Sequence, residues 1–171
     1  MVSYGLTATD YRSGCVTGPS GRGLTRVEID AFLGGAVIAR LATVKPDGAP
    51  HVTPVWHHWD GQAPWVIPRA KSSFVANIRH VPRVCVSVAD DVDPLHTRVV
   101  IDGRAEVVEG PAKMQGLMLE IASDMARRYM GPDGPKYVGR TADRARFLIR
   151  VTPERVSSWR GNEWHPRYLE A

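Results

Sequence analysis

Residues 66–73 have the sequence Val-Ile-Pro-Arg-Ala-Lys-Ser-Ser, which places two cations and two hydroxyl groups at the end of an apolar run. Ser72 or Ser73 can cap a helix that begins here, and the free backbone N–H groups of a helix start bind anions. With Arg69 and Lys71 beside them, the pattern predicts a phosphate site where a strand turns into a helix. From these residues alone, an exposed Arg and Lys next to an ordinary serine cap is an equally good interpretation.

The segments before this turn are short and apolar, and residues typical of tight turns separate them. Residues 36–44 and 51–56 flank Pro46-Asp-Gly48, a pattern that predicts two strands joined by a tight turn. A second turn at residues 60–61 leads to a third strand over residues 64–68. We therefore expect three antiparallel strands in close succession, a β-meander.

Further strands and a first helix follow from the same kind of pattern. Strands are predicted over residues 83–88, 98–108 and 146–151, the second with a bend at Gly103. Residues 25–28 have the pattern of a capping box, which predicts a short helix. The sequence therefore predicts a mainly β (α+β) fold, a six-stranded antiparallel β-barrel with short flanking helices.

An apolar stripe at helical spacing follows Pro111, and it consists of Met114, Leu117, Met118, Ile121 and Met125. We interpret it as the packing face of a helix rather than as a cofactor site. No element is predicted for the polar residues 131–144. Residues 1–23 lack a hydrophobic period and are expected to form a flexible arm, ahead of a single domain over residues 24–171.

Charge and composition exclude several classes of protein. The 22 basic and 18 acidic residues form no run of like charge, so nucleic acid binding is not expected. Cys15 and Cys85 occur in unrelated contexts and indicate neither a disulfide framework nor a metal site. A leader and a run of about 20 apolar residues are both missing from the sequence. We therefore expect a soluble, cytoplasmic protein with no membrane partner.

Three histidines, His51, His57 and His58, lie on or beside the second strand. They could protonate a reduced substrate or bind a metal. Neighbouring residues of a strand point to opposite faces, and a third ligand is missing from the pattern, so a metal site is not expected.

Three longer stretches, taken in order, carry a resemblance to a known family. They are LATVKPDGAPHVTPVW (residues 41–56), PRAKSSFVANIRHVPRV (residues 68–84) and VTPERVSSWRGNEWHPRY (residues 151–168). Over roughly residues 25–168 the chain resembles the pyridoxamine 5'-phosphate oxidase-like family, the flavin-binding split barrels. The resemblance implies a split barrel and a homodimer, with two cofactor sites that both chains line.

The resemblance also implies which residues hold the cofactor. Arg69, Lys71 and Ser72 match the phosphate-binding turn of the family. The segments that lie against the isoalloxazine ring match Thr53, Pro54, Val55, Trp56, Val66, Ile67 and Pro68. Trp159 and Arg167 resemble an aromatic and basic pair that reaches the cofactor from the partner chain.

The ring system and the reaction stay open at this point. FMN is the expected cofactor, and the alternatives are haem and coenzyme F-420, whose acidic tail suits Arg69, Arg79, Arg160 and Arg167. The resemblance implies an oxidoreductase that transfers a hydride to or from a small organic substrate, or else a carrier of flavin or haem without turnover. Oxidation of vitamin B6 is not expected, because no counterpart of the residues for that substrate precedes Lys45. No catalytic residue is assigned.

Overall fold

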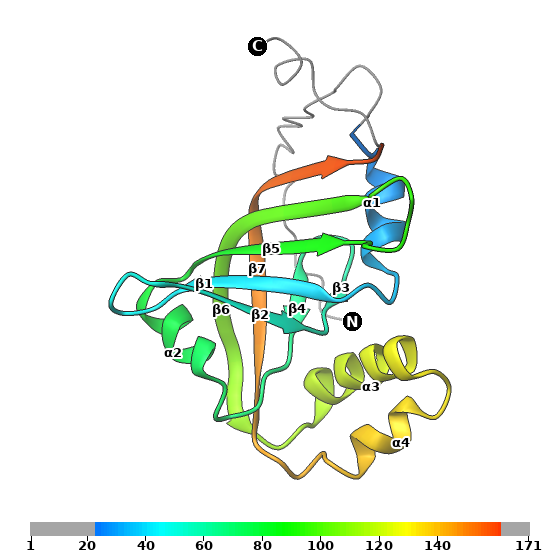
Figure 1. The fold of residues 1–171 in the computed structure, drawn as a ribbon. Coiled ribbons are helices and arrows are strands. Elements are labelled where there is room, and N and C mark those ends of the chain that lie inside the picture. Colours follow the sequence, from blue (N-terminus) through cyan, green and yellow to red (C-terminus); the bar gives the residue numbers. More distant parts are fainter. Residues whose placement is uncertain (1–22, 162–171) are drawn as a thin grey trace.

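A single antiparallel sheet runs through the residues that the computed structural model describes, 23–161 (Figure 1). Its strands lie in the order β2-β1-β5-β6-β7-β4-β3. The strands are β1 (Ala39–Val44), β2 (Pro50–Val55), β3 (His58–Trp59), β4 (Pro64–Val66), β5 (Arg83–Ala89), β6 (Arg98–Ala112) and β7 (Arg146–Trp159). The helices of this part of the chain are α1 (Arg26–Leu33), α2 (Ser73–His80), α3 (Gly116–Met130) and α4 (Gly134–Gly139). The predicted mainly β fold with short flanking helices is confirmed, with seven strands where six were predicted.

The predicted β-meander is wrong. β1 and β2 do pair as a hairpin, but β4 lies at the other end of the sheet, where Val66 is opposite Ile149 of β7. The turn at residues 60–61 instead joins β4 to the additional short strand β3. Alternating apolar residues indicate a strand but not its neighbour, because pairing depends on where the apolar face is buried. Val66 is only 1% exposed in its place beside β7.

β6 and β7 are the longest strands, and they curve around the core, as Figure 1 shows in green and orange. The register between them shifts at Asp102/Gly103, which confirms the predicted bend at Gly103. A Cβ atom on Gly103 would collide with the carbonyl group of Thr152, so the close approach of the two strands requires glycine. The curved sheet forms an open barrel whose edge strands are β2 and β3.

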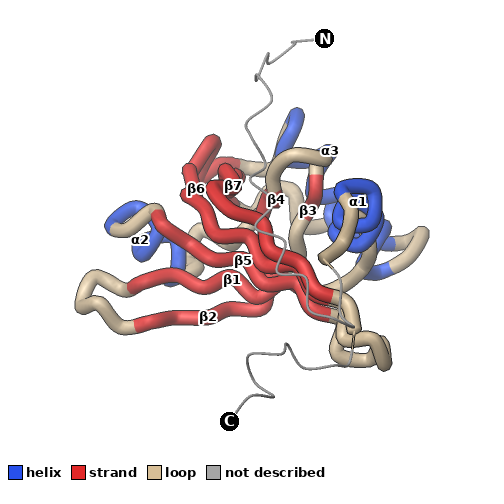
Figure 2. The backbone as a smooth tube through the Cα atoms, turned by 90° about the horizontal axis from the view of Figure 1, so that it is seen from above, coloured by secondary structure: helices blue, strands red, loops and turns tan. Residues whose placement is uncertain are grey.

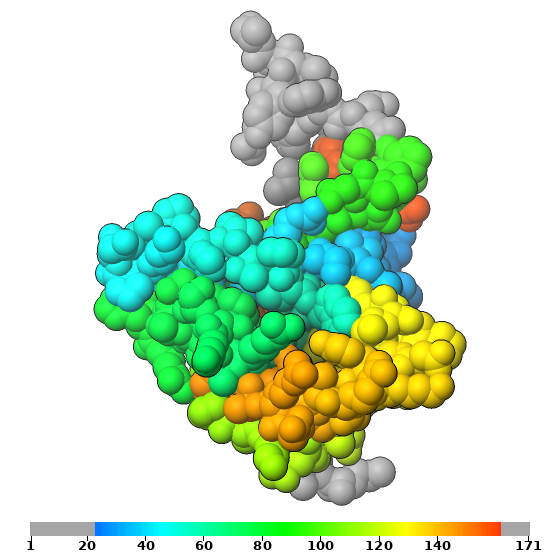
Figure 3. Space-filling view, turned by 60° about the horizontal axis from the view of Figure 1, so that its bottom comes forward, coloured from blue at the N-terminus to red at the C-terminus, as the bar shows by residue number. Residues whose placement is uncertain are grey.

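Two groups of buried apolar side chains hold the fold together. The first fills the inside of the curved sheet and includes Leu41, Val86 and Ile101. The second lies between the sheet and the pair α3 and α4, and it includes Met118 and Leu148. Seen from above, α2 lies at one end of the sheet, and α1 and α3 lie at the other (Figure 2). The space-filling view shows the yellow and orange surface of α3 and α4 beside the green segment that contains α2 (Figure 3).

The helix ends follow local sequence signals in part. Thr25 and Glu28 form the predicted capping box at the start of α1. α4 lies within the stretch for which no element was predicted, and it packs closely on α3 because Gly134 lies against the carbonyl group of Ala126. Residues 1–22 of the expected arm lie outside the described residues. No helix between residues 23 and 161 has the length and apolar character needed to cross a membrane.

Candidate functional site

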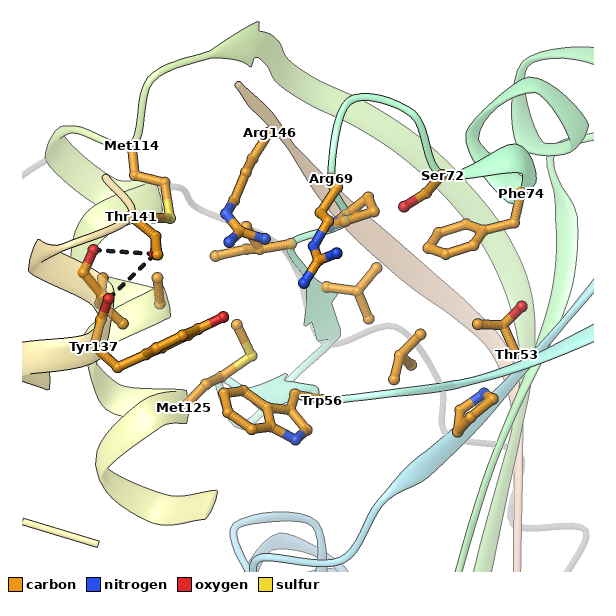
Figure 4. A pocket seen from close by; sticks show the side chains of 17 residues that line it. Thr53, Trp56, Arg69, Ser72, Phe74, Met114, Met125, Tyr137, Thr141 and Arg146 are labelled. Atoms are coloured by element: carbon orange, nitrogen blue, oxygen red, sulfur yellow. Dashed lines mark hydrogen bonds between the residues drawn. The ribbon is translucent and has the colours of Figure 1, made fainter. Parts of the chain in front are cut away.

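A cavity of about 390 Å³ lies between β2, β4, the start of α2 and the helix pair α3 and α4 (Figure 4). Sites for small molecules typically measure about 300–1,000 Å³. The cavity is lined by Thr53, Pro54, Val55, Trp56, Val66, Ile67, Pro68, Arg69, Ser72, Phe74, Met114, Ala122, Met125, Tyr137, Val138, Thr141 and Arg146.

Most of the residues predicted to hold a cofactor are brought together in this cavity. They are Thr53, Pro54, Val55, Trp56, Val66, Ile67, Pro68, Arg69 and Ser72. The end of β2 and the segment from β4 to α2 therefore form one wall of the cavity, although β2 and β4 are not paired in the sheet. That these residues contact a cofactor stays a prediction.

Of the other three predicted residues, two lie elsewhere and one is not described. Lys71 is exposed and does not line the cavity. Trp159 lies at the far end of β7, where its Nε1 donates a hydrogen bond of 2.8 Å to the carbonyl group of Gly161. Arg167 lies outside the described residues. Contacts of Trp159 and Arg167 with the cofactor of a partner chain therefore stay predictions.

Two guanidinium groups meet at one end of the cavity. Arg69 and Arg146 form an isolated antiparallel bridge, and Figure 4 shows both side chains reaching into the cavity. The Nε atom of Arg146 is buried and has no hydrogen-bond partner within residues 23–161. Ser72, whose side chain makes no capping hydrogen bond, lies near them. No carboxylate occurs among the described residues of the lining, and neither arginine forms an ion pair with a carboxylate within residues 23–161, although Arg69 is exposed to solvent.

Trp56 lines the cavity at the end of β2, and its ring is held by stacking. Its ring lies on that of Tyr129, with 5.1 Å between the ring centroids and 8° between the planes. The hydroxyl group of Tyr129 donates to the carbonyl group of Val37 over 3.0 Å and lies 3.0 Å from Nδ1 of His57. The tryptophan in the cavity wall is therefore supported from behind by a fixed ring.

Arg128 anchors the same region through hydrogen bonds to the backbone. Its guanidinium group donates to the carbonyl groups of Leu33 over 3.2 Å and of His57 over 2.9 Å. Burial of the ring, followed by the charge of Arg128, lowers the pKa of His57 to about 4. His57 is therefore neutral near pH 7, and its Nε2 donates to the carbonyl group of Leu33 over 3.0 Å.

The other two histidines also have protein partners. Nε2 of His51 lies 2.8 Å from Oγ1 of Thr53, and Nδ1 of His58 lies 2.8 Å from Oδ2 of Asp124. Within residues 23–161 no group of three His, Cys, Asp or Glu side chains comes close enough to hold a metal ion.

Sequence reasoning missed the second wall of the cavity. The missed residues are Phe74, Met114, Ala122, Met125, Tyr137, Val138, Thr141 and Arg146. Met114 and Met125 belong to the stripe that was interpreted as packing, and they are indeed buried in the second core while also facing the cavity. Arg146 becomes a neighbour of Arg69 only through the pairing of β4 with β7, for which the sequence carries no local signal.

An open antiparallel barrel with a basic and apolar cavity beside its edge defines the class of split barrels. The model of the pyridoxamine 5'-phosphate oxidase family matches residues 26–160, and the chain belongs to this family. The resemblance found in the sequence is thereby confirmed.

Solved structures support the same assignment. A conserved hypothetical protein from Mycobacterium tuberculosis is 29% identical, with 89% of this chain and 90% of that chain covered and a TM-score of 0.68. An F-420 reductase is 28% identical, with 75% and 94% covered and a TM-score of 0.58. HutZ, a heme storage protein from Vibrio cholerae, is 21% identical, with 76% and 91% covered and a TM-score of 0.58, and it shows the fold alone. None of the curated proteins matches the chain.

Proposed function

We propose that the protein binds a flavin-type cofactor in this cavity and acts as an oxidoreductase that transfers a hydride to or from a small organic substrate. The observation that carries the proposal is the pairing of an uncompensated basic end, formed by Arg69 and Arg146, with an apolar slot beside Trp56. A flavin-type molecule needs both, because it joins a flat ring system to a phosphate group.

The residues of the cavity fit such a group. The buried Nε atom of Arg146 lacks a partner, and a buried N–H group without a hydrogen bond costs about 1–3 kcal/mol. An anion that accepts from Arg146 and Arg69 would remove this cost and would also relieve the repulsion between the two like charges. The hydroxyl group of Ser72 and the N-terminal N–H groups of α2 supply further donors.

The bound cofactor would supply the hydride chemistry, and the chain would supply binding and orientation. Trp56 and Ile67 offer apolar surface for a ring, and Arg69 and Arg146 would fix the ring through the phosphate. α3 and α4 cover the other side, so they would keep water from a reacting pair. No acid or base of the protein is required for the transfer itself.

Of the two flavin-type cofactors, F-420 is supported by the similarity to an F-420 reductase at 28% identity over 94% of that chain. Arg79 is a candidate for binding the acidic tail, and its Cζ atom lies 5.0 Å from the ring centroid of Phe147. FMN would need only the phosphate donors already described. A haem carrier is less well supported, because the described lining of the cavity contains no histidine to bind the iron.

A homodimer is part of the proposal. The cavity lies beside the edge strand β2, whose Val52 is 60% exposed. A second copy packed against this side would cover the exposed apolar residues and would bring its own Trp159 and Arg167 toward the ligand. Light scattering of the purified protein tests this part.

The absorption spectrum and the mass of the ligand released from the purified protein test the proposal. A yellow protein whose visible absorbance bleaches on reduction, and which releases a ligand of the mass of FMN or F-420, is the expected result. A haem spectrum would contradict the proposal, as would failure of the ligand-free protein to take up either cofactor when it is added.

A further inference from the structure

The hydroxyl group of Tyr137 stands in the cavity without a hydrogen-bond partner among the described residues. Figure 4 shows the ring of Tyr137 reaching from α4, with its oxygen directed between Met125 and Arg69. The backbone carbonyl group of Tyr137 accepts a hydrogen bond of 3.2 Å from the hydroxyl group of Thr141. Tyr137 is half-buried, so its hydroxyl group can donate a hydrogen bond to a molecule that occupies the cavity.

α4 holds this ring in a fixed position. A Cβ atom on Gly134 would collide with the carbonyl group of Ala126, so the start of α4 lies directly on α3. At the other end, Thr141 donates to the carbonyl group of Val138, which is only 4% exposed. The direction of the Tyr137 side chain is therefore set by the packing of the helix pair.

Most side chains of the cavity wall that contains Tyr137 are apolar. The neighbouring lining residues of α3, α4 and the segment before α3 are Met114, Ala122, Met125 and Val138. They form the wall opposite the strand segments that the proposed cofactor would contact. A hydride passes between atoms about 3–3.5 Å apart, so a substrate would lie between the cofactor and this second wall.

We propose that Tyr137 is a specificity-determining residue that donates a hydrogen bond to a carbonyl oxygen of a flat, apolar substrate of the enone or quinone type. This inference rests on the proposed function. The hydrogen bond would orient the substrate over the cofactor and polarise its carbonyl group. Thioether and aromatic side chains around it suit a flat hydrocarbon ring.

Ligand binding measured by tryptophan fluorescence tests the role of Tyr137, because Trp56 lies in the same cavity. Menadione and 2-methylnaphthalene are titrated into the purified protein, since the two share a ring system but only menadione has carbonyl groups. A Tyr137→Phe variant should bind menadione roughly 3- to 10-fold more weakly and should bind 2-methylnaphthalene as the unchanged protein does.

A Tyr129→Phe variant is the matched control, because the hydroxyl group of Tyr129 bonds only within the protein, to Val37 and His57. This variant should keep the difference between menadione and 2-methylnaphthalene, and thermal unfolding shows that both variants are folded. Equal menadione affinity of the Tyr137→Phe variant and the unchanged protein would overturn the inference.

The cofactors also carry carbonyl groups, so the Tyr137 hydroxyl group could bond to the cofactor rather than to the substrate. Titration of the same variants with FMN and F-420 distinguishes these two cases. Unchanged cofactor affinity in Tyr137→Phe supports a bond to the substrate, whereas a loss confined to the cofactor would overturn it. If the unchanged protein bound neither cofactor, the proposed function would fail. The comparison of menadione with 2-methylnaphthalene would still report on the Tyr137 hydroxyl group.

Discussion

Arg69 and Arg146 are direct neighbours across an antiparallel bridge, and both side chains reach into the same cavity. Two guanidinium groups repel each other, and the buried Nε atom of Arg146 has no partner among the described residues to offset its loss of water. A protein keeps such a pair at a cost in stability. The anionic ligand that we propose for this end of the cavity would offset this cost.

The first prediction is that an Arg146→Met variant unfolds less readily than the unchanged protein when no ligand is present. The substitution removes the unpaired N–H group and the like charge, so the free energy of unfolding should rise by about 1 kcal/mol. Added phosphate should stabilise the unchanged protein but not the variant. Denaturant titrations with and without phosphate measure both effects.

The control for this prediction is Arg150→Met on the same strand. Arg150 packs over the ring of Trp65 and donates to the hydroxyl group of Thr152 over 3.1 Å. Its removal should not raise stability. Equal gains in the two variants would show that Arg146 carries no special cost.

A second prediction concerns pH. The pKa of His57 is lowered from 6.5 to about 4 by burial and then by Arg128, with His58 and Tyr129 as further neighbours. Between pH values of about 4 and 6.5, His57 is protonated in the unfolded chain but neutral in the folded chain. The free energy of unfolding should therefore fall as the pH drops from about 6.5 to about 4, in total by about 3 kcal/mol.

Replacement of His57 by Gln isolates this contribution. The amide group of Gln can still donate to the carbonyl group of Leu33, as Nε2 of His57 does, but it does not titrate. Denaturant titrations across this pH range should show a shallower decline for the His57→Gln variant. The same slope in both proteins would mean that His57 is not the group responsible.

A third prediction concerns the packing of α4. In a Gly134→Ala variant the new methyl group would collide with the carbonyl group of Ala126, so α4 must move away from α3. We expect a loss of about 1–3 kcal/mol in the free energy of unfolding and weaker binding of any ligand that contacts Tyr137. A Gly139→Ala variant is the control, because a Cβ atom there would meet nothing within 4 Å. Equal stability of the two variants would contradict the packing described.

A fourth prediction concerns Cys85 on the outer face of the sheet. Burial, and then the carboxylate of Asp102 on the paired strand, raise the pKa of the thiol to about 11. Only the thiolate reacts with iodoacetamide, so near pH 8 Cys85 should be alkylated roughly two orders of magnitude more slowly than an unperturbed cysteine. Asp102→Asn should speed the reaction. Mass spectrometry of the peptide that contains Cys85 gives the rate, and a normal rate would refute the assignment.

The sequence was informative wherever a local pattern determines the structure. The capping box at Thr25, the hairpin of β1 and β2, and the bend at Gly103 all depend on neighbouring residues or on one backbone contact. The basic turn was likewise visible, because Arg69 and Ser72 lie three residues apart in one segment.

Features that depend on tertiary pairing could not be predicted in this way. Arg146 is one charged residue in an alternating strand, and only the position of β4 beside β7 brings it to Arg69. Tyr137 belongs to a polar stretch whose helix forms because Gly134 fits against α3. For Lys71 the sequence was misleading in the other direction. It lies within the basic turn in the sequence, but its side chain does not line the cavity.

The central claim is that the cavity holds a flavin-type cofactor by its phosphate group. Its most direct test is a fluorescence titration of FMN against riboflavin, and of F-420 against its phosphate-free deazaflavin precursor. The unchanged protein should prefer one of the phosphorylated ligands by at least roughly tenfold. In the Arg69→Ala/Arg146→Ala variant this preference should vanish while affinity for the phosphate-free ring persists. A Lys71→Ala variant measures how much Lys71, the other cation of the predicted turn, contributes to the same preference. Equal affinity of the unchanged protein for both members of each pair, or a preference that survives in the double variant, would contradict the claim.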